Sequence, residues 1–357
     1  MKIQKVSIEN VKNFKNRTEI ELSNYNVFIG KNGSGKSNFA KSIFQAVDTP
    51  TNYGVGLVTF QGDRSRSSVV TVEVLLRKED IHFLAQGGVF NALQQNSLPA
   101  QLKNDTILGI TEQPNLTLQK GLSNNGRVFA IKEYPLHEDI NTVRGRFYNE
   151  LYLRISNELR KKVLFIPDTR DLPAQFQYDQ NYANLPMTTN NFMTFFTALK
   201  LDRRQQKTYD KIIELACRIV PSIEDLLINP VGNIVGLGER GSSYEIPAQE
   251  ISKGTREVLV LISMIAMAKE GSVVIIEEPE VHLHPKAVKE FREIIRELIS
   301  KNNLQIIITT HNPDFLVGLI PEDPETKGMK FVREIDGSSS IQVVTNTIEL
   351  GEAMNEV

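Results

Sequence analysis

The chain has 357 residues, of which 40% are hydrophobic and 24% are charged, a composition typical of a globular protein with a large buried core. A formal net charge of -2 excludes an overall basic field that would attract nucleic acid, but it leaves room for local patches. The single cysteine, Cys217, excludes a disulfide within one chain, and no apolar run reaches the length of a membrane span. We therefore expect a cytoplasmic protein with no membrane partner.

The N-terminal region predicts three strands and a glycine-rich loop. Residues 3–9 and 17–22 alternate with period two, which indicates strands that precede the apolar strand 27–29 and pack beside it. The loop that begins at Gly30 fits G-x-x-x-x-G-K-[ST], and a helix is expected over 36–47. The sequence thus places a phosphate-binding motif between a strand and a helix.

The glycines of this loop permit close backbone approaches, so successive N–H groups can point at one anion, and the helix adds the positive end of its dipole. We expect Lys36 to reach the β- and γ-phosphates of ATP and the Ser37 hydroxyl to hold Mg²⁺. The alternative is a glycine-rich turn that binds nothing. The residues expected to contact the nucleotide here are Gly30, Asn32, Gly33, Ser34, Gly35, Lys36, Ser37 and Asn38.

The middle of the chain predicts further strands followed by helices. Strands are expected over 67–76, 106–111, 116–120 and 127–134, the last three as an antiparallel meander, with a short helix and loops over 78–104. Helices are expected over 141–162, 190–199 and 203–220, with a strand over 163–166 and a long loop over 168–189. Strand-like segments 223–229 and 244–251 flank a glycine-rich turn over 232–241.

The last third alternates between helix and strand, which is typical of parallel α/β packing. Helices are expected over 255–269, 285–300 and 313–319, and buried strands over 272–276 and 304–309. Catalytic groups in such sheets lie just past the carboxyl ends of the strands.

Acidic and histidine residues follow these two strands. We expect Glu277 to hold Mg²⁺ through its waters, and Glu278 to orient and deprotonate a water in line with the γ-phosphate. His311 follows the next strand and could donate a hydrogen bond to the γ-phosphate. The alternatives are an acidic turn and a polar strand terminus. Ser252 and Gly254 begin a helix, where they either cap it or contact ATP bound to another protomer.

In this order and spacing, the motifs resemble the ATP-binding-cassette ATPases and, among them, the RecF, SMC and OLD (overcoming lysogenization defect) branch. Residues 8–15 resemble the first hairpin of that branch and residues 277–285 its strand end, while residues 165–170 match only in outline. The resemblance implies a P-loop α/β head with a mostly parallel core sheet, an antiparallel β-subdomain and a helical insertion. The division expected is an N-terminal lobe over 1–140, an insertion over 141–243 and a C-terminal lobe over 244–357.

The resemblance also implies a homodimer that sandwiches two ATP molecules, with Ser252 and Gly254 completing the partner's site. Lys12 and Asn13 are expected to contact the nucleotide, and Gln61 to be the loop glutamine at Mg²⁺, although it could equally be a solvated residue. His282 and His284 would contact the other protomer, or by their spacing bind a metal. Two departures are Glu277, where Asp is usual, and Lys253 within the signature Ser-Gly-Gly.

The function expected is a soluble ATPase that dimerises head to head on ATP and couples hydrolysis to DNA or to a separate effector, in DNA repair or anti-phage defence. OLD nucleases carry a C-terminal Toprim domain, and only about forty residues follow Leu319, so a nuclease or toxin would be a separate polypeptide. The alternatives are an ATP-binding scaffold with little turnover and a transporter ATPase subunit. The basic clusters 64–66 and 203–204 are expected to be solvated surface, and if the protein binds DNA the first is the better candidate.

Overall fold

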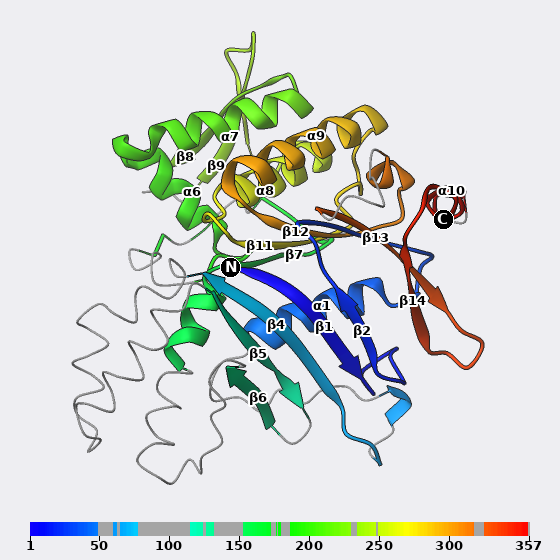
Figure 1. Ribbon diagram of the computed structural model, residues 1–357. Coiled ribbons are helices and arrows are strands. Elements are labelled where there is room, and N and C mark those ends of the chain that lie inside the picture. Colours follow the sequence, from blue (N-terminus) through cyan, green and yellow to red (C-terminus); the bar gives the residue numbers. More distant parts are fainter. Residues whose placement is uncertain are drawn as a thin grey trace, which may run out of the picture. The chain divides into compact units, whose positions relative to one another are not determined.

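Three sheets organise the described residues of this computed structural model (Figure 1). The residues that the structure describes are 1–48, 60–62, 65–77, 115–123, 126–131, 153–172, 176, 178–179, 186–229, 234–247, 249–317 and 325–355. They belong to two compact units, each built from separated parts of the chain. The first comprises Met1–Ser23, Gly33–Val163 and Phe331–Gln342, and the second comprises Asn24–Asn32, Leu164–Lys330 and Val343–Val357.

The first unit contains an antiparallel sheet with the strand order β2-β1-β4-β5-β6. Its strands are β1 (Lys2–Glu9), β2 (Thr18–Glu21), β4 (Val69–Arg77), β5 (Asn115–Ser123) and β6 (Gly126–Ile131). Helix α1 (Lys36–Asp48) packs on β4 and β5, and it buries residues at helical spacing such as Phe39, Ile43 and Val47. A short 3-10 turn, η1 (Phe60–Gly62), also belongs to this unit.

Strands β1 and β2 were expected to pack beside the strand before the phosphate loop, and the structure gives them other partners. They pair with each other, and β1 pairs with β4, rather than lying in the sheet of the strand before the phosphate loop. The expected strand 67–76 and the hairpin of the meander are confirmed, and β5 and β6 extend this same sheet. The strand expected over 106–111 and the helix and loops expected over 78–104 lie outside the described residues.

A six-stranded sheet has the order β14-β13-β3-β12-β11-β7, and its strands β3, β12 and β11 lie wholly within the second unit. The strands are β3 (Tyr25–Ile29), β7 (Val163–Ile166), β11 (Val273–Glu277), β12 (Gln305–Thr310), β13 (Thr326–Arg333) and β14 (Ser339–Val344). The four neighbours β13, β3, β12 and β11 run parallel. Every residue of β3, β11 and β12 is buried, as expected for central strands covered on both faces.

Helices cover this sheet, and Figure 1 shows α8 and α9 above one of its faces. The helices of the second unit are α6 (Phe192–Leu201), α7 (Gln206–Ile219), α8 (Lys253–Ala266), α9 (Pro285–Asn302) and α10 (Thr347–Asn355), with the 3-10 turns η4 (Arg203–Gln205) and η5 (Pro313–Leu316). Helix α8 is buried from Glu257 to Ile265 because α6 and α7 also pack on it. Of the helix expected over 141–162, residues 153–160 are described and helical.

A small antiparallel sheet replaces the glycine-rich turn that was expected over 232–241. Its strands are β8 (Ile223–Asn229), β9 (Ile234–Glu239) and β10 (Glu245–Pro247), in the order β10-β9-β8. A Cβ on Gly236 would lie 3.1 Å from the Ile246 carbonyl oxygen, so this glycine permits close strand approach rather than a turn. The prediction of a turn was therefore wrong over 234–239, although residues 240–241 do form one, and the strand expected over 244–251 is shorter. Among the described helices, none has both the length and the apolarity that a membrane crossing requires.

Candidate functional site

The carboxyl ends of three parallel strands meet at one edge of the six-stranded sheet. Glu277 at the end of β11 pairs in register with Thr309 of β12, and Thr310 pairs with Ile29 at the end of β3. The residues that follow these ends are Glu278, His311 and Gly30. Ligands of open α/β sheets bind at such an edge, so the register brings the expected acidic pair, the histidine and the start of the phosphate loop to the place where chemistry is expected.

Glu278 and His311 contact each other directly. His311 Nε2 lies 3.0 Å from Glu278 Oε1, and each side chain is about a quarter exposed. Glu278 has a φ of 41° and lies just beyond the last strand residue, so this left-handed turn, rather than strand alternation, sets the direction of its carboxylate. A carboxylate that contacts an imidazole is held in one orientation and can accept a proton.

Glu277 and Glu280 occupy the same strand end with different surroundings. The carboxylate of Glu277 is buried, with 1% of the residue exposed. Glu280 Oε1 accepts hydrogen bonds from Thr310 Oγ1 at 2.5 Å and from the His311 backbone N–H at 2.8 Å, so it fixes the backbone that carries the histidine. Sequence reasoning assigned no role to Glu280, although it belongs to the Glu-Glu-Pro-Glu motif.

The phosphate loop, residues 30–37, has the left-handed backbone conformations that its glycines predict. Gly33 and Gly35 have φ values of 75° and 102°, which are unfavourable for residues with a Cβ. Ser34 is 1% exposed, and among the described residues its Oγ has no hydrogen-bond partner. A buried hydroxyl of this kind fits a phosphate oxygen, and the buried Glu277 carboxylate is a hard oxygen donor that fits Mg²⁺. Lys36 is also buried, while Ser37 is half-buried and Asn32 is exposed.

The first unit brings together two of the expected nucleotide contacts. Asn38 Nδ2 donates a hydrogen bond to Asn13 Oδ1. Residues 11 and 14 exchange backbone hydrogen bonds of 3.0 and 2.8 Å, which places Lys12 and Asn13 at a tight turn, with Lys12 in the left-handed region. The hairpin and the first turn of α1 are therefore joined through side chains.

Gln61 contacts a backbone carbonyl of the turn between β13 and β14. Its Nε2 donates to the Asp336 oxygen at 3.1 Å, and its φ of 46° is left-handed. Lys15 Nζ lies 3.0 Å from the Asp336 carboxylate, and hydrogen bonds from Ser338 and then Lys15 hold the pKa of that carboxyl well below its usual range. The role of Gln61 at Mg²⁺ stays a prediction.

The start of α8 has the cap that the sequence indicates. Ser252 Oγ accepts a hydrogen bond from the Thr255 backbone N–H at 3.3 Å, while the residue stays exposed. A Cβ on Gly254 would lie 2.9 Å from the His282 carbonyl oxygen, so the first turn of α8 packs tightly on the segment after β11. The contact of Ser252 and Gly254 with another protomer's ATP stays a prediction.

His282 and His284 have separate protein partners. His282 Nδ1 lies 3.0 Å from Glu257 Oε1 and its Nε2 lies 3.1 Å from Lys253 Nζ. His284 Nδ1 accepts a hydrogen bond from the Lys286 backbone N–H at 3.3 Å and caps α9. No group of three or more potential metal ligands occurs within the part of the chain that the structure describes. The geometry thus favours structural roles for both histidines over a metal site.

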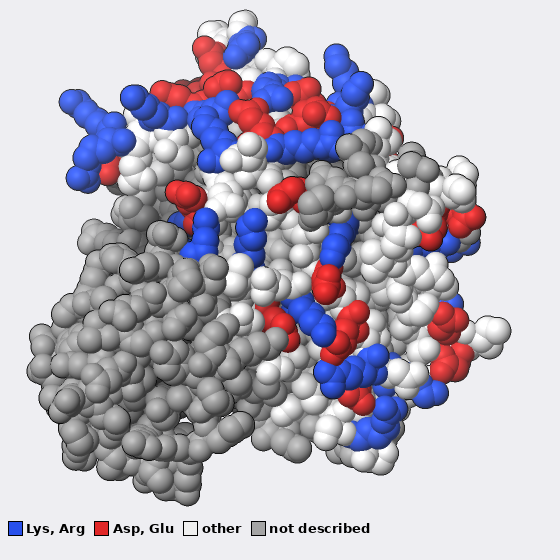
Figure 2. Space-filling view, in the orientation of Figure 1, with Lys and Arg blue, Asp and Glu red and all other residues white. Residues whose placement is uncertain are grey.

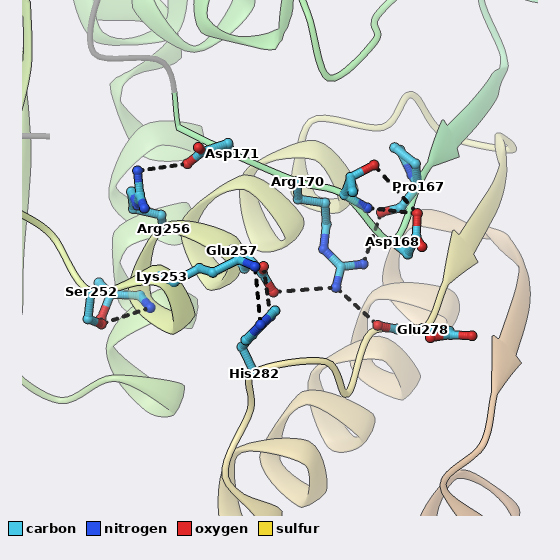
Figure 3. A network of polar contacts seen from close by, with 12 residues as sticks. Pro167, Asp168, Arg170, Asp171, Ser252, Lys253, Arg256, Glu257, Glu278 and His282 are labelled. Carbon is cyan, nitrogen blue, oxygen red and sulfur yellow. Dashed lines mark hydrogen bonds and ion pairs between the residues drawn. The ribbon is translucent and has the colours of Figure 1, made fainter. Parts of the chain in front are cut away.

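Arg170 is the centre of a polar network that sequence reasoning missed (Figure 3). Its side chain is fully buried, and it donates from Nη1 to the carbonyls of Glu277 at 2.8 Å and Pro167 at 3.2 Å, and from Nη2 to the carbonyl of Glu278 at 3.0 Å. Glu257 lies 3.7 Å from the same Nη2. Burial lowers the pKa of Arg170, and the charge of Glu257 opposes that shift. The sequence signals were its place after the strand that ends at Ile166 and the match in outline of residues 165–170, and neither assigned it a role.

Each of the two basic clusters has one described arginine that is paired with an acid. Arg66 lies 3.3 Å from Glu9, and Arg204 lies 3.0 Å from Asp202. Figure 2 shows Lys and Arg interspersed with Asp and Glu over the helical part of the face in view. Charges of both signs on this face give no one-signed field for nucleic acid.

Two family models match the chain, and two of the proteins that are similar to it are an OLD nuclease and an ATP/GTP phosphatase. A model described as "AAA domain, putative AbiEii toxin, Type IV TA system" matches residues 114–317, and one described as "AAA ATPase domain" matches residues 1–87. An OLD nuclease of Thermus scotoductus is 33% identical over 140 residues, which are 35% of this chain and 26% of the relative, so the chain spans about a quarter of that protein. An ATP/GTP phosphatase of Helicobacter pylori is 21% identical over 341 residues, which are 88% of this chain and 86% of the relative.

Solved structures of SMC head domains have a similar fold. The SMC head bound to the C-terminal winged-helix domain of ScpA gives a TM-score of 0.56 at 13% identity, covering 96% of this chain and 98% of the other. The SMC head of Thermotoga maritima gives 0.53 at 13% identity, covering 96% and 99%. These likenesses confirm the expected α/β head fold.

Proposed function

Since the chain belongs to the family described as "AAA domain, putative AbiEii toxin, Type IV TA system", whose model matches more than half of its residues, we propose that it binds ATP at the strand ends of the six-stranded sheet. We propose further that it hydrolyses ATP there and pairs with a second copy while ATP is bound. Family membership makes the chain an ATPase. The assignment of residues, the pairing and the coupling to other molecules are the proposal.

The contact between Glu278 and His311 carries the assignment of the chemistry. The two residues follow neighbouring parallel strands, and their side chains lie 3.0 Å apart at the edge where ligands of such sheets bind. Glu278 would act as the general base that orients the attacking water and accepts its proton. His311 Nε2, which contacts that carboxylate in this structure, would donate to the γ-phosphate once ATP is bound.

The residues that would hold ATP are the phosphate loop, Lys12, Asn13 and Asn38, and those that would hold Mg²⁺ are Ser37 and Glu277, with Gln61 as a further candidate. The buried Ser34 hydroxyl and the buried Glu277 carboxylate support this set. Bound Mg²⁺ neutralises charge that develops on the β- and γ-phosphate oxygens. Lys36 would bind the same oxygens, and the dipole of α1 would favour the negative charge.

The proposed cycle is coupled to DNA or to a separate effector, either a nuclease or a toxin, in the cytoplasm. The likeness to an OLD nuclease and the toxin in the family's description support an effector of this class, and the SMC head that binds ScpA is a neighbour that engages another protein. Purification of the Glu278→Gln protein with ATP tests the coupling. An effector or DNA that requires the ATP-bound form should stay with this variant and leave the wild type after hydrolysis.

Two substitutions test the proposed chemistry. We expect Glu278→Gln to lower kcat by about 10²- to 10⁴-fold while ATP still binds, because only the proton acceptor is lost. Lys36→Ala should abolish ATP binding, because the phosphates lose their cation. Steady-state phosphate release and the binding of a fluorescent ATP analogue measure the two effects.

The matched control is Glu270→Gln, because Glu270 is exposed and lies outside the site. It should leave kcat unchanged. Full turnover by Glu278→Gln would contradict the assignment of the base. A wild type that binds ATP without turnover would favour the scaffold alternative.

A further inference from the structure

The segment from Glu278 to His282 is held in a strained conformation. Glu278 and His282 have φ values of 41° and 61°, in the left-handed region that residues with a Cβ rarely adopt. Such conformations are unfavourable and persist only where the surroundings enforce them. The contacts that enforce this segment therefore determine where the Glu278 carboxylate lies.

Both polar groups of the Glu278 backbone are occupied. Its N–H donates to the Thr309 carbonyl of β12 at 2.8 Å, and its carbonyl accepts from Arg170 Nη2 at 3.0 Å. Arg170 also holds the carbonyl of Glu277, so one guanidinium fixes two successive peptide oxygens at the end of β11. The planar fork of arginine can serve several acceptors at fixed angles, and the ammonium of lysine cannot reproduce that geometry.

Glu257 connects Arg170 to the other strained residue. Its carboxylate lies 3.7 Å from Arg170 Nη2 and 3.0 Å from His282 Nδ1, and its side chain is 3% exposed (Figure 3). Glu257 belongs to α8, whose first turn packs on the His282 carbonyl at Gly254. One buried ion pair thus contacts both ends of the segment.

We propose that Arg170 is a positioning residue of the ATPase site, which fixes the backbone of Glu278 so that its carboxylate meets His311, and that Glu257 orients the Arg170 guanidinium. The inference rests on the proposed function, because it concerns the geometry of the proposed base. Arg170 touches neither the nucleotide nor the reacting water in this role. It acts through the backbone of Glu278.

A purely structural ion pair is the competing explanation, and a double variant separates the two. Removing Arg170 alone would leave Glu257 as a buried charge without its arginine, which destabilises any fold. Arg170→Met combined with Glu257→Leu leaves no unpaired buried charge, so it should regain much of the stability that Arg170→Met alone loses, apart from the cost of the carbonyls that lose their donor. A structural pair predicts that this double variant recovers both its melting temperature and its turnover. A positioning role predicts that only the melting temperature recovers.

The experiment compares the melting temperature, kcat and KM for ATP of the wild type, Arg170→Lys and the double variant. We expect kcat to fall about 10- to 100-fold in the double variant with KM within about twofold, because a misplaced base slows the chemical step and leaves ATP binding intact. Arg170→Lys keeps a cation for Glu257 and should fold. Its kcat should be intermediate, because one ammonium cannot hold both carbonyls.

The control is Lys200→Met. Lys200 of α6 also donates to a carboxylate, Asp225 Oδ2 at 2.8 Å, and to a backbone carbonyl, that of Leu226 at 2.6 Å, but it lies outside the site. Its loss should lower the melting temperature and leave kcat unchanged. Wild-type kcat in both the double variant and Arg170→Lys would overturn the role of Arg170, and so would a rise in KM with kcat unchanged. A wild type without turnover would contradict the proposed function instead.

Discussion

Left-handed backbone conformations gather at the residues assigned to the candidate site. Among the described residues, the non-glycine positions with such φ values are Asn10, Lys12, Gln61, Glu278, His282 and Asn303. Asn303 ends α9, where this conformation is an ordinary helix cap, and the other five lie in or beside the segments expected to bind or act on ATP. Since strain of this kind persists where function or tight packing requires it, the distribution supports the assignment of the site.

Two glycines of the phosphate loop separate the cost of a left-handed backbone from the additional cost of crowding around an added Cβ. Gly33 has no heavy atom within 4 Å of an added Cβ, so Gly33→Ala should lower the free energy of unfolding by about 1–2 kcal/mol, the cost of its φ. On Gly35 a Cβ would lie 2.7 Å from Ser339 Oγ and 3.2 Å from Ser339 Cβ. Gly35→Ala should therefore cost about 1–3 kcal/mol more in urea unfolding. Equal losses for the two variants would contradict this packing of Gly35 on Ser339.

At the scale of elements, a buried lysine closes the end of α1. Lys120 of β5 has no exposed surface, and its Nζ donates to the Val47 carbonyl, one of the last four of the helix, which have no helical N–H partner. Lys120→Met would keep the packing and remove this donor, so we expect the free energy of unfolding to fall by about 1–3 kcal/mol in urea titrations.

Lys301→Met is the control for this prediction. Lys301 lies in the last turn of α9 and is exposed, so its substitution should change the free energy of unfolding by less than about 0.5 kcal/mol. A comparable loss in both variants would mean that the charge at a helix end matters more than the buried hydrogen bond.

The elements that the sequence predicted best are those whose local pattern has one interpretation. The unbroken apolar run of β11 and the capped, amphipathic helices α8 and α9 lie within a few residues of their expected bounds. Strand β13 gave no such signal, because it carries three cationic residues in eight, and β9 was hidden by its glycines. The pairing of β1 with β4 depends on long-range contacts that no local pattern encodes.

The same distinction separates the parts of the candidate site. Glu278 and His311 could be foreseen together, because parallel strands end at the same sheet edge. Arg170 could not, because its acceptors at Glu277 and Glu278 lie more than a hundred residues away and only the tertiary fold brings them together. The resemblance over short motifs predicted the fold and the phosphate loop, but it did not predict the polar network around Arg170.

At the scale of the whole molecule, the expected resemblance to the RecF, SMC and OLD branch agrees with the two AAA family models, with the OLD nuclease that is 33% identical over 140 residues, and with the fold of SMC heads that cover 96% of the chain. The structure contains a single protomer, so the ATP-dependent pairing stays a proposal. The exposed Ser252 at the start of α8 gives this pairing a specific test, because its substitution should harm the partner's site rather than its own protomer's fold.

We expect Glu278→Gln with ATP and Mg²⁺ to double its mass in light scattering, because the ATP that holds two protomers together is no longer hydrolysed. Adding Ser252→Arg to this variant should weaken the pairing at least about tenfold, because a bulky cation replaces the hydroxyl at the contact, while ATP still binds to the monomer. Ser243→Arg, an equal change at an exposed serine between β9 and β10, should leave the dimer intact. Dimers that withstand Ser252→Arg would contradict the contact across protomers, and monomers in every state would contradict the pairing itself.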